Sequence, residues 1–137
     1  MKGLPTLIRV RTWELEEKRR KVADLEALEA QLVEAIARLD DEVQLENQVA
    51  SNDTDASFTY GSYISAAIDR RRTLDASVED VGRQIEAARE EVTVAYQELK
   101  KFEVAHSNRK RRVREEANRR EQVVLDEIGI ETFRRRG

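Results

Sequence analysis

Few residues of this chain have side chains suited to catalysis or to metal binding. The only histidine is His106, there is no cysteine, and adjacent glutamates occur at Glu90-Glu91 and Glu115-Glu116. Paired carboxylates can act as general acid and base or bind a metal ion. A catalytic site would also need a partner histidine, a glycine-rich loop or a pocket that shifts a carboxylate pKa. The five glycines are scattered along the chain, so we expect no enzyme, no metal site and no cofactor.

A basic run, Arg109-Lys110-Arg111-Arg112-Val113-Arg114, has the residue types that neutralise phosphates. Glu115 and Glu116 follow it directly, and helical pairing with neighbouring arginines dilutes its charge. No aromatic residue that could stack on a base is interleaved with the arginines. A charged helix that binds an acidic protein surface is therefore favoured, and a nucleic-acid-binding rod using Arg109 to Arg120 remains the alternative.

Two heptad patterns of apolar residues organise the chain, and we call them the first and second seams. In the second seam, eleven of twelve positions are apolar, with Arg71 the exception. Its positions are Ile64, Ala67, Arg71, Leu74, Val78, Val81, Ile85, Ala88, Val92, Ala95, Leu99 and Phe102. This spacing predicts a long helix with a narrow apolar stripe, which needs another helix to cover it.

The first seam lies nearer the N-terminus, and nine of its twelve positions are apolar. Its positions are Leu4, Ile8, Arg11, Leu15, Lys18, Val22, Leu25, Glu29, Leu32, Ile36, Leu39 and Val43. The charged exceptions have long side chains whose stems can lie along a seam. A polar cluster at residues 51–57 separates the seams, and Asp55 or Ser57 is expected to cap the next helix. The pattern predicts an all-α fold, an antiparallel two-helix coiled-coil hairpin with a longer C-terminal helix.

The predicted helices form a single domain. The first helix covers about 5–50, the turn about 51–57 and the second helix about 58–128, followed by a tail at 129–137. At about 1.5 Å per residue the helices span roughly 70 and 105 Å. The N-terminal end of the first helix therefore lies opposite residues 103–106. The C-terminal part of the second helix extends beyond it without a partner from its own chain.

Charge and apolar residues mark this C-terminal part. Residues 1–105 carry 15 basic and 22 acidic side chains, a net charge of -7, whereas residues 106–137 carry 10 and 6, a net charge of +4. An apolar cap, typical of a partner site, is formed by Val123, Val124, Leu125, Ile128, Ile130 and Phe133. After the turn come Phe58, Tyr60, Tyr63 and Ile64, which either pack the hairpin or form an interface.

The composition favours a coiled coil over a globular core. Charged residues make up 39% of the 137 residues and aromatic residues 5%, a balance typical of long helices. No apolar run reaches the roughly eighteen residues of a membrane span, and no signal-peptide core stands at the N-terminus. We therefore expect a soluble cytoplasmic protein.

Three segments carry a resemblance to a known family. Leu4-Pro5-Thr6-Leu7 leads into Trp13-Glu14-Leu15-Glu16-Glu17-Lys18, Tyr60-Gly61-Ser62-Tyr63-Ile64 follows the turn, and a charged run from Glu98 ends in Leu125-Asp126-Glu127-Ile128. Over nearly its whole length the chain resembles the flagellar type III export protein FliJ and its relatives, the YscO-like injectisome stalk proteins. The resemblance implies a fold similar to the central stalk of rotary ATPases.

The resemblance also implies partners and sites. The implied partners are the export ATPase FliI with its regulator FliH, the export gate protein FlhA and flagellar substrate chaperones, in the cytoplasm and peripherally at the inner membrane. The residues expected to bind the ATPase are Arg109, Arg112, Arg120, Val124, Leu125, Asp126, Glu127 and Ile128. The residues expected to bind the gate are Tyr60, Tyr63 and Ile64. Ala67 and Arg70 depart from the family pattern near the gate surface.

Two further alternatives remain open. The chain can be a structural coiled coil that dimerises through its C-terminal part, or the equivalent stalk protein of a virulence-type secretion system.

Overall fold

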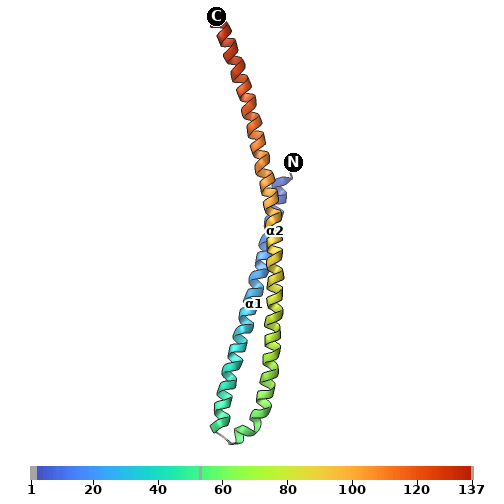
Figure 1. The fold of residues 1–137 in the computed structure, drawn as a ribbon, viewed down its shortest axis with the longest axis vertical. Coiled ribbons are helices and arrows are strands. Elements are labelled where there is room, and N and C mark those ends of the chain that lie inside the picture. The colour runs from blue at the N-terminus through green and yellow to red at the C-terminus, as the bar shows by residue number, and fades with distance from the viewer. Residues whose placement is uncertain (1–2, 53, 137) are drawn as a thin grey trace. The chain divides into compact units, whose positions relative to one another are not determined.

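The fold consists of two long helices. The computed structural model describes residues 3–52 and 54–136, apart from the side chains of residues 54–58. In this part of the chain it contains α1 (Leu4–Asn52) and α2 (Thr54–Arg136) and no strand (Figure 1). The predicted all-α fold with a longer second helix is confirmed, since α2 has 83 residues and α1 has 49.

The structure corrects several predicted helix boundaries. Ser51 and Asn52 belong to α1, and α2 begins at Thr54, so the predicted turn at 51–57 is too long. α2 also continues to Arg136, where the sequence pattern predicts a tail from residue 129. The last turn contains three arginines, whose positive charges interact favourably with the negative end of the helix dipole. The predicted cap at Asp55 or Ser57 and the side chain of Phe58 lie outside the described residues.

The contacts divide the chain into two compact units. The loop unit comprises Leu15–Val94, and the terminal unit comprises Met1–Glu14 together with Ala95–Gly137. Each unit therefore contains one part of α1 and one part of α2, and each is described by itself.

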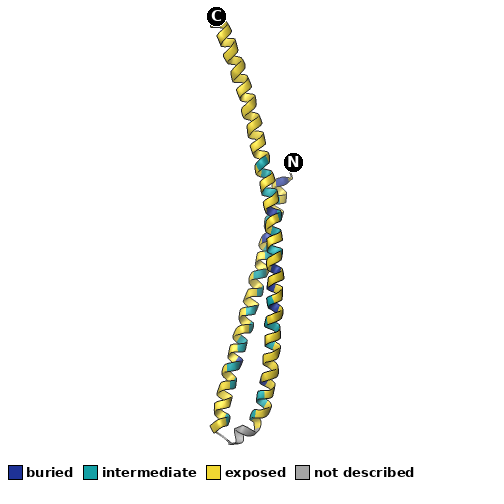
Figure 2. Ribbon diagram, in the orientation of Figure 1, coloured by how far each residue is buried: buried dark blue, intermediate teal, exposed yellow. Residues whose placement is uncertain are grey.

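In the loop unit the two seams pack against each other. Its buried apolar side chains are Leu15, Leu39, Ala67, Val81, Ile85 and Ala88 (Figure 2). Ion pairs flank this contact: Lys18 pairs with Glu91 at 3.4 Å, Glu26 with Arg89 at 3.0 Å, and Asp40 with Arg71. The residue number of the α2 partner falls as that of the α1 partner rises, so the two segments run antiparallel.

In the terminal unit the start of α1 packs against α2. Leu4 and Leu99 are both 7% exposed, and the Arg11 guanidinium lies over the Phe102 ring, 5.6 Å from its centroid. Pro5 is tolerated in the first turn of α1 because its missing N–H would have no partner in the helix. Figure 1 shows α1 beginning beside α2, which continues far beyond that point.

Both seams are found where the spacing predicts them. All twelve positions of the first seam are buried or half-buried, including the charged exceptions Arg11, Lys18 and Glu29. In the second seam eleven positions are buried or half-buried, and Arg71 is exposed. The periodicity therefore identified the packing face of each helix.

Candidate protein-binding surfaces

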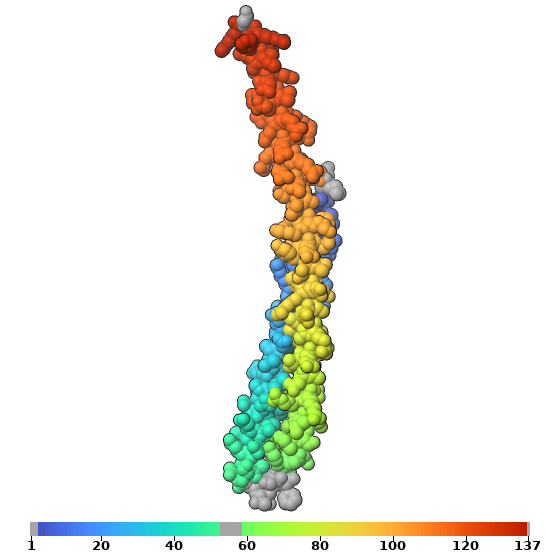
Figure 3. Space-filling model, in the orientation of Figure 1, coloured from blue at the N-terminus to red at the C-terminus, as the bar shows by residue number. Residues whose placement is uncertain are grey.

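The C-terminal part of α2 extends past the start of α1 (Figure 1). Every residue from Arg109 to Arg136 is exposed (Figures 2 and 3), and we call this segment the overhang. It contains all eight residues predicted to bind an ATPase, whereas Tyr60, Tyr63 and Ile64 lie in the loop unit.

Large apolar side chains of the overhang are open to solvent. Val123 and Val124 are 53% exposed, Leu125 is 55% exposed, and Phe133 is 79% exposed. Because successive residues of an α-helix point about 100° apart, the consecutive residues Val123, Val124 and Leu125 face three different directions. The apolar cap therefore surrounds the helix instead of forming a single stripe.

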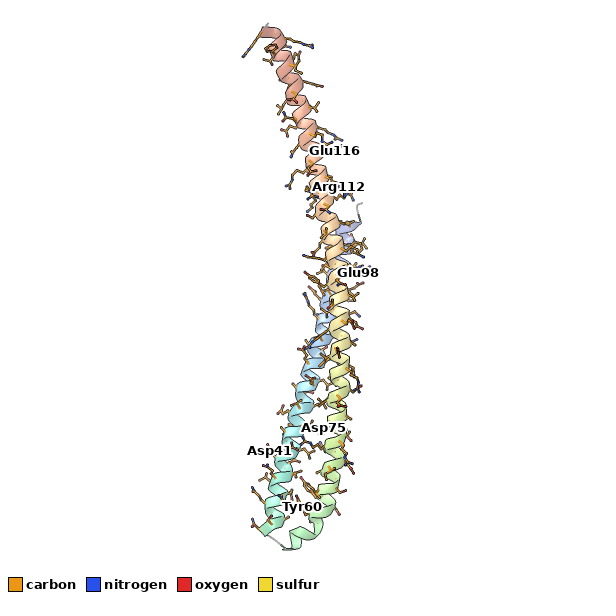
Figure 4. All side chains as sticks on the ribbon, in the orientation of Figure 1. Asp41, Tyr60, Asp75, Glu98, Arg112 and Glu116 are labelled. Carbon is orange, nitrogen blue, oxygen red and sulfur yellow. The ribbon has the colours of Figure 1, made fainter. Side chains whose placement is uncertain are left out.

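The basic residues of the overhang fall into two groups. Arg111, Arg120 and Arg135 pair with Glu115 at 3.9 Å, Glu116 at 2.7 Å and Glu131 at 3.1 Å. In the described part of the chain no ion pair is formed by Arg109, Lys110, Arg112 or Arg114. Figure 4 shows Arg112 on α2, one turn before Glu116. Arg119, Arg134 and Arg136 also form no ion pair with a described residue, so four of the seven unpaired cations lie at the start of the overhang.

Two grooves lie where α1 begins beside α2, a place that we call the step. One has a volume of about 460 Å³ and is lined by Pro5, His106, Arg109, Lys110, Val113, Arg114 and Ala117. The other, of about 480 Å³, is lined by Leu4, Ala105, Asn108, Arg109 and Arg112. The sequence pattern does not mark Pro5, Val113 or Ala117 as site residues. The one indication of these grooves in the sequence is that the N-terminal end of the first helix is predicted to lie opposite residues 103–106.

The predicted gate residues lie against α1 within the loop unit. Tyr60, Tyr63 and Ile64 are half-buried (Figure 4 labels Tyr60). Partial burial raises the pKa of Tyr63, and the nearby carboxylates of Glu42 and Glu46 raise it further. The Tyr63 phenol is therefore neutral and faces acidic residues of α1.

Ile64 also lines a small groove, which has a volume of about 110 Å³. Its walls are Leu39, Asp40, Val43, Ile64, Ala67, Ile68 and Arg71. The lining therefore includes the small side chain of Ala67 and the ion-paired residues Asp40 and Arg71.

His106 and Glu91, two of the residues considered for catalysis or metal binding, lie near the contacts between α1 and α2. His106 is half-buried at the step. A hydrogen bond from Lys21 and the charges of Lys18 and Lys21 lower the pKa of Glu91, which therefore acts as an ion-pair partner. Within residues 3–52 and 54–136, no three His, Asp or Glu side chains meet as metal ligands.

Neither described helix contains a stretch long and apolar enough to span a membrane.

Comparison with known families identifies the chain's relatives. The family model described as flagellar FliJ protein matches residues 1–137. The chain belongs to the FliJ family. No curated protein and no solved structure matches it. This FliJ-family chain is accordingly a component of the flagellar type III export apparatus.

Proposed function

We propose that this FliJ-family chain binds the export ATPase FliI as a central stalk, with the overhang as the contact. The supporting observation is that the overhang is exposed throughout and carries large apolar side chains in every direction. A flat partner would cover only one side of the apolar cap, whereas a ring that surrounds the helix would cover all sides. The net positive charge of the overhang would complement acidic loops in such a ring.

The proposed contact would favour the assembled ATPase ring, because a ligand stabilises the state that it binds. The regulator FliH would meet the chain through the same ATPase complex. This role is associative and needs no catalytic side chain on the chain itself.

The second proposed contact joins the loop unit to the export gate protein FlhA. Tyr60, Tyr63 and Ile64 supply half-buried aromatic and apolar surface next to the small groove beside Ala67. Aromatic side chains of this kind are enriched among the residues that dominate binding energy. Through both contacts the chain would assist the delivery of chaperones and substrates, in the cytoplasm at the base of the flagellum.

The ATPase contact is tested by deleting residues 123–137. The deletion is expected to abolish stimulation of FliI ATPase activity. The helical signal in circular dichroism should fall only by the share of the deleted residues, because none of them packs on α1. Full stimulation by the shortened chain would refute the overhang as the working end.

A matched control separates charge from the apolar cap. Replacing Arg134, Arg135 and Arg136 by glutamine keeps every apolar side chain of the cap. We expect partial stimulation that depends on salt concentration. Light scattering on the intact chain addresses dimerisation: a monomer at micromolar concentration is expected, and a tight dimer lost on the same deletion would favour the structural coiled coil.

A further inference from the structure

The interface between α1 and α2 ends abruptly at the step, but the apolar face of α2 continues. Val113, Ala117, Val124 and Ile128 recur at intervals of four, seven and four residues, which places them on one side of the helix. His106, which is half-buried at the step, lies on the same side. We call these four residues the extension stripe.

The groove at the step connects this stripe to the existing interface. Pro5 of α1 and Val113 and Ala117 of α2 line the same groove of about 460 Å³. The groove therefore joins the first turn of α1 to Val113 and Ala117, two residues of the extension stripe. A helix bound along the stripe would adjoin the start of α1.

The charges at the step select the kind of helix. Arg109, Lys110, Arg112 and Arg114 lie around the grooves and form no ion pair with any described residue. The first turn of α1 contains no acidic residue, so the positive end of its dipole is not compensated locally. A second copy of the overhang would bring further positive charge, whereas an acidic helix would neutralise it.

We propose that the extension stripe binds an amphipathic partner helix with acidic flanks, laid antiparallel to α2 with its C-terminal end toward Pro5. In this orientation the negative end of the partner's dipole meets the positive end of α1. The bound helix continues the packing of α1 against α2. This inference rests on the proposed function, in which the overhang is the contact, and assigns one side of the overhang to an acidic partner helix. Val123, Leu125 and Phe133 lie on other sides of α2.

A synthetic peptide tests the proposal on the full chain. The probe is a helix-forming peptide of about 20 residues with leucine at the two seam positions of each heptad and glutamate on the flanks. A second peptide carries lysine on the flanks. Fluorescence anisotropy is expected to show binding of the acidic peptide alone, weakening as salt is added. Equal binding of both peptides would overturn the proposal.

Point variants locate the bound peptide. Val124→Ser should weaken binding of the acidic peptide by about tenfold, because buried apolar contact is lost. Leu125→Ser is the control: Leu125 is 55% exposed and Val124 53%, and their side chains point about 100° apart. This control removes more apolar surface but should change binding by less than about twofold. A larger loss in the Leu125 variant would show that the peptide does not lie on the extension stripe.

The orientation is measured by energy transfer. Because the chain has no cysteine, Thr6→Cys provides a single labelling site on the exposed side of the first turns of α1. With a dye pair of short Förster distance, a donor on the C-terminus of the peptide should transfer more efficiently to this label than a donor on the N-terminus, about 30 Å away along the helix. The reverse result would refute the orientation. A dimer of the chain that Val124→Ser dissolves would assign the stripe to a second copy and refute the acidic partner.

Discussion

Arg71 of α2 forms an ion pair with Asp40 of α1 at the only charged position of the second seam. The hydrogen bond to Asp40 raises the pKa of Arg71, so the arginine stays charged, and Asp75 lies 3.7 Å from its Nε. Exposed pairs of this kind contribute little to stability. We therefore infer that this pair favours one register of α1 against α2.

Arg71→Leu should leave the melting temperature unchanged or raise it. Leucine would continue the apolar seam, and the lost surface ion pair stabilises the fold only weakly. Thermal denaturation followed by circular dichroism measures this effect. Arg72→Leu is the control, since Arg72 lies off the seam and forms no ion pair with a described residue. If Arg71→Leu lowers the melting temperature strongly, the pair has more than a role in register.

Val81→Ala should destabilise the loop unit by about 1–3 kcal/mol, because it leaves a cavity between the seams. Val81 is 5% exposed. The matched control is Val33→Ala in the same unit, where the valine is 52% exposed and the expected change is within about 0.5 kcal/mol. Urea unfolding would give both values. Similar losses at the two positions would contradict the seam packing.

Acid should weaken the contact made by Glu91. Its carboxylate has a pKa below the ordinary value of 4.5 in the folded chain, mainly through the hydrogen bond from Lys21. A lowered pKa stabilises the fold above pH 4.5, and this contribution is lost as the pH falls below that value through the folded pKa.

The comparison of Glu91→Gln with the parent chain measures this contribution. At pH 7 the variant should melt at a lower temperature, and the difference should shrink as the pH is lowered. Glu90→Gln serves as control, because Glu90 forms no ion pair with any residue that the structure describes. A difference that is constant with pH would mean that Glu91 acts through packing alone.

Tyr63→Ala should weaken binding to FlhA by about tenfold if the loop unit carries the proposed gate contact. Binding to FliI should not change, because Tyr63 lies outside the overhang. Tyr63→Phe retains the ring and is expected to bind FlhA nearly as well as the parent chain. Titration calorimetry with each partner would show this. An equal loss of both affinities would mean that Tyr63 only packs against α1.

Periodicity was sufficient to predict the two helices and their packing faces. A single stripe with charged flanks leaves one way to bury Val81, Ile85 and Ala88, and the structure buries them so. Periodicity could not predict where α2 ends. The sequence suggested a tail from residue 129, but Gly129 has no positive φ and an ion pair between Glu131 and Arg135 supports the last turns.

The sequence pattern also could not predict which residues of α1 and α2 form ion pairs with each other. Asp40 and Arg71 are 31 residues apart, and only the register of α1 against α2 brings them together. The groove at the step has the same origin, since Pro5 meets His106 and Val113 through the end of one helix beside another. Its residues show no local motif.

The overhang is supported only by its own backbone hydrogen bonds and by local pairs such as Arg120 with Glu116. Most of the stability of helices in proteins comes from tertiary packing, and the exposed overhang has little of it. Warming would therefore fray the overhang while the seams of the loop unit still hold. Any partner that binds it in warm conditions must rewind the helix, so its grip would weaken with heat well before the chain itself melts.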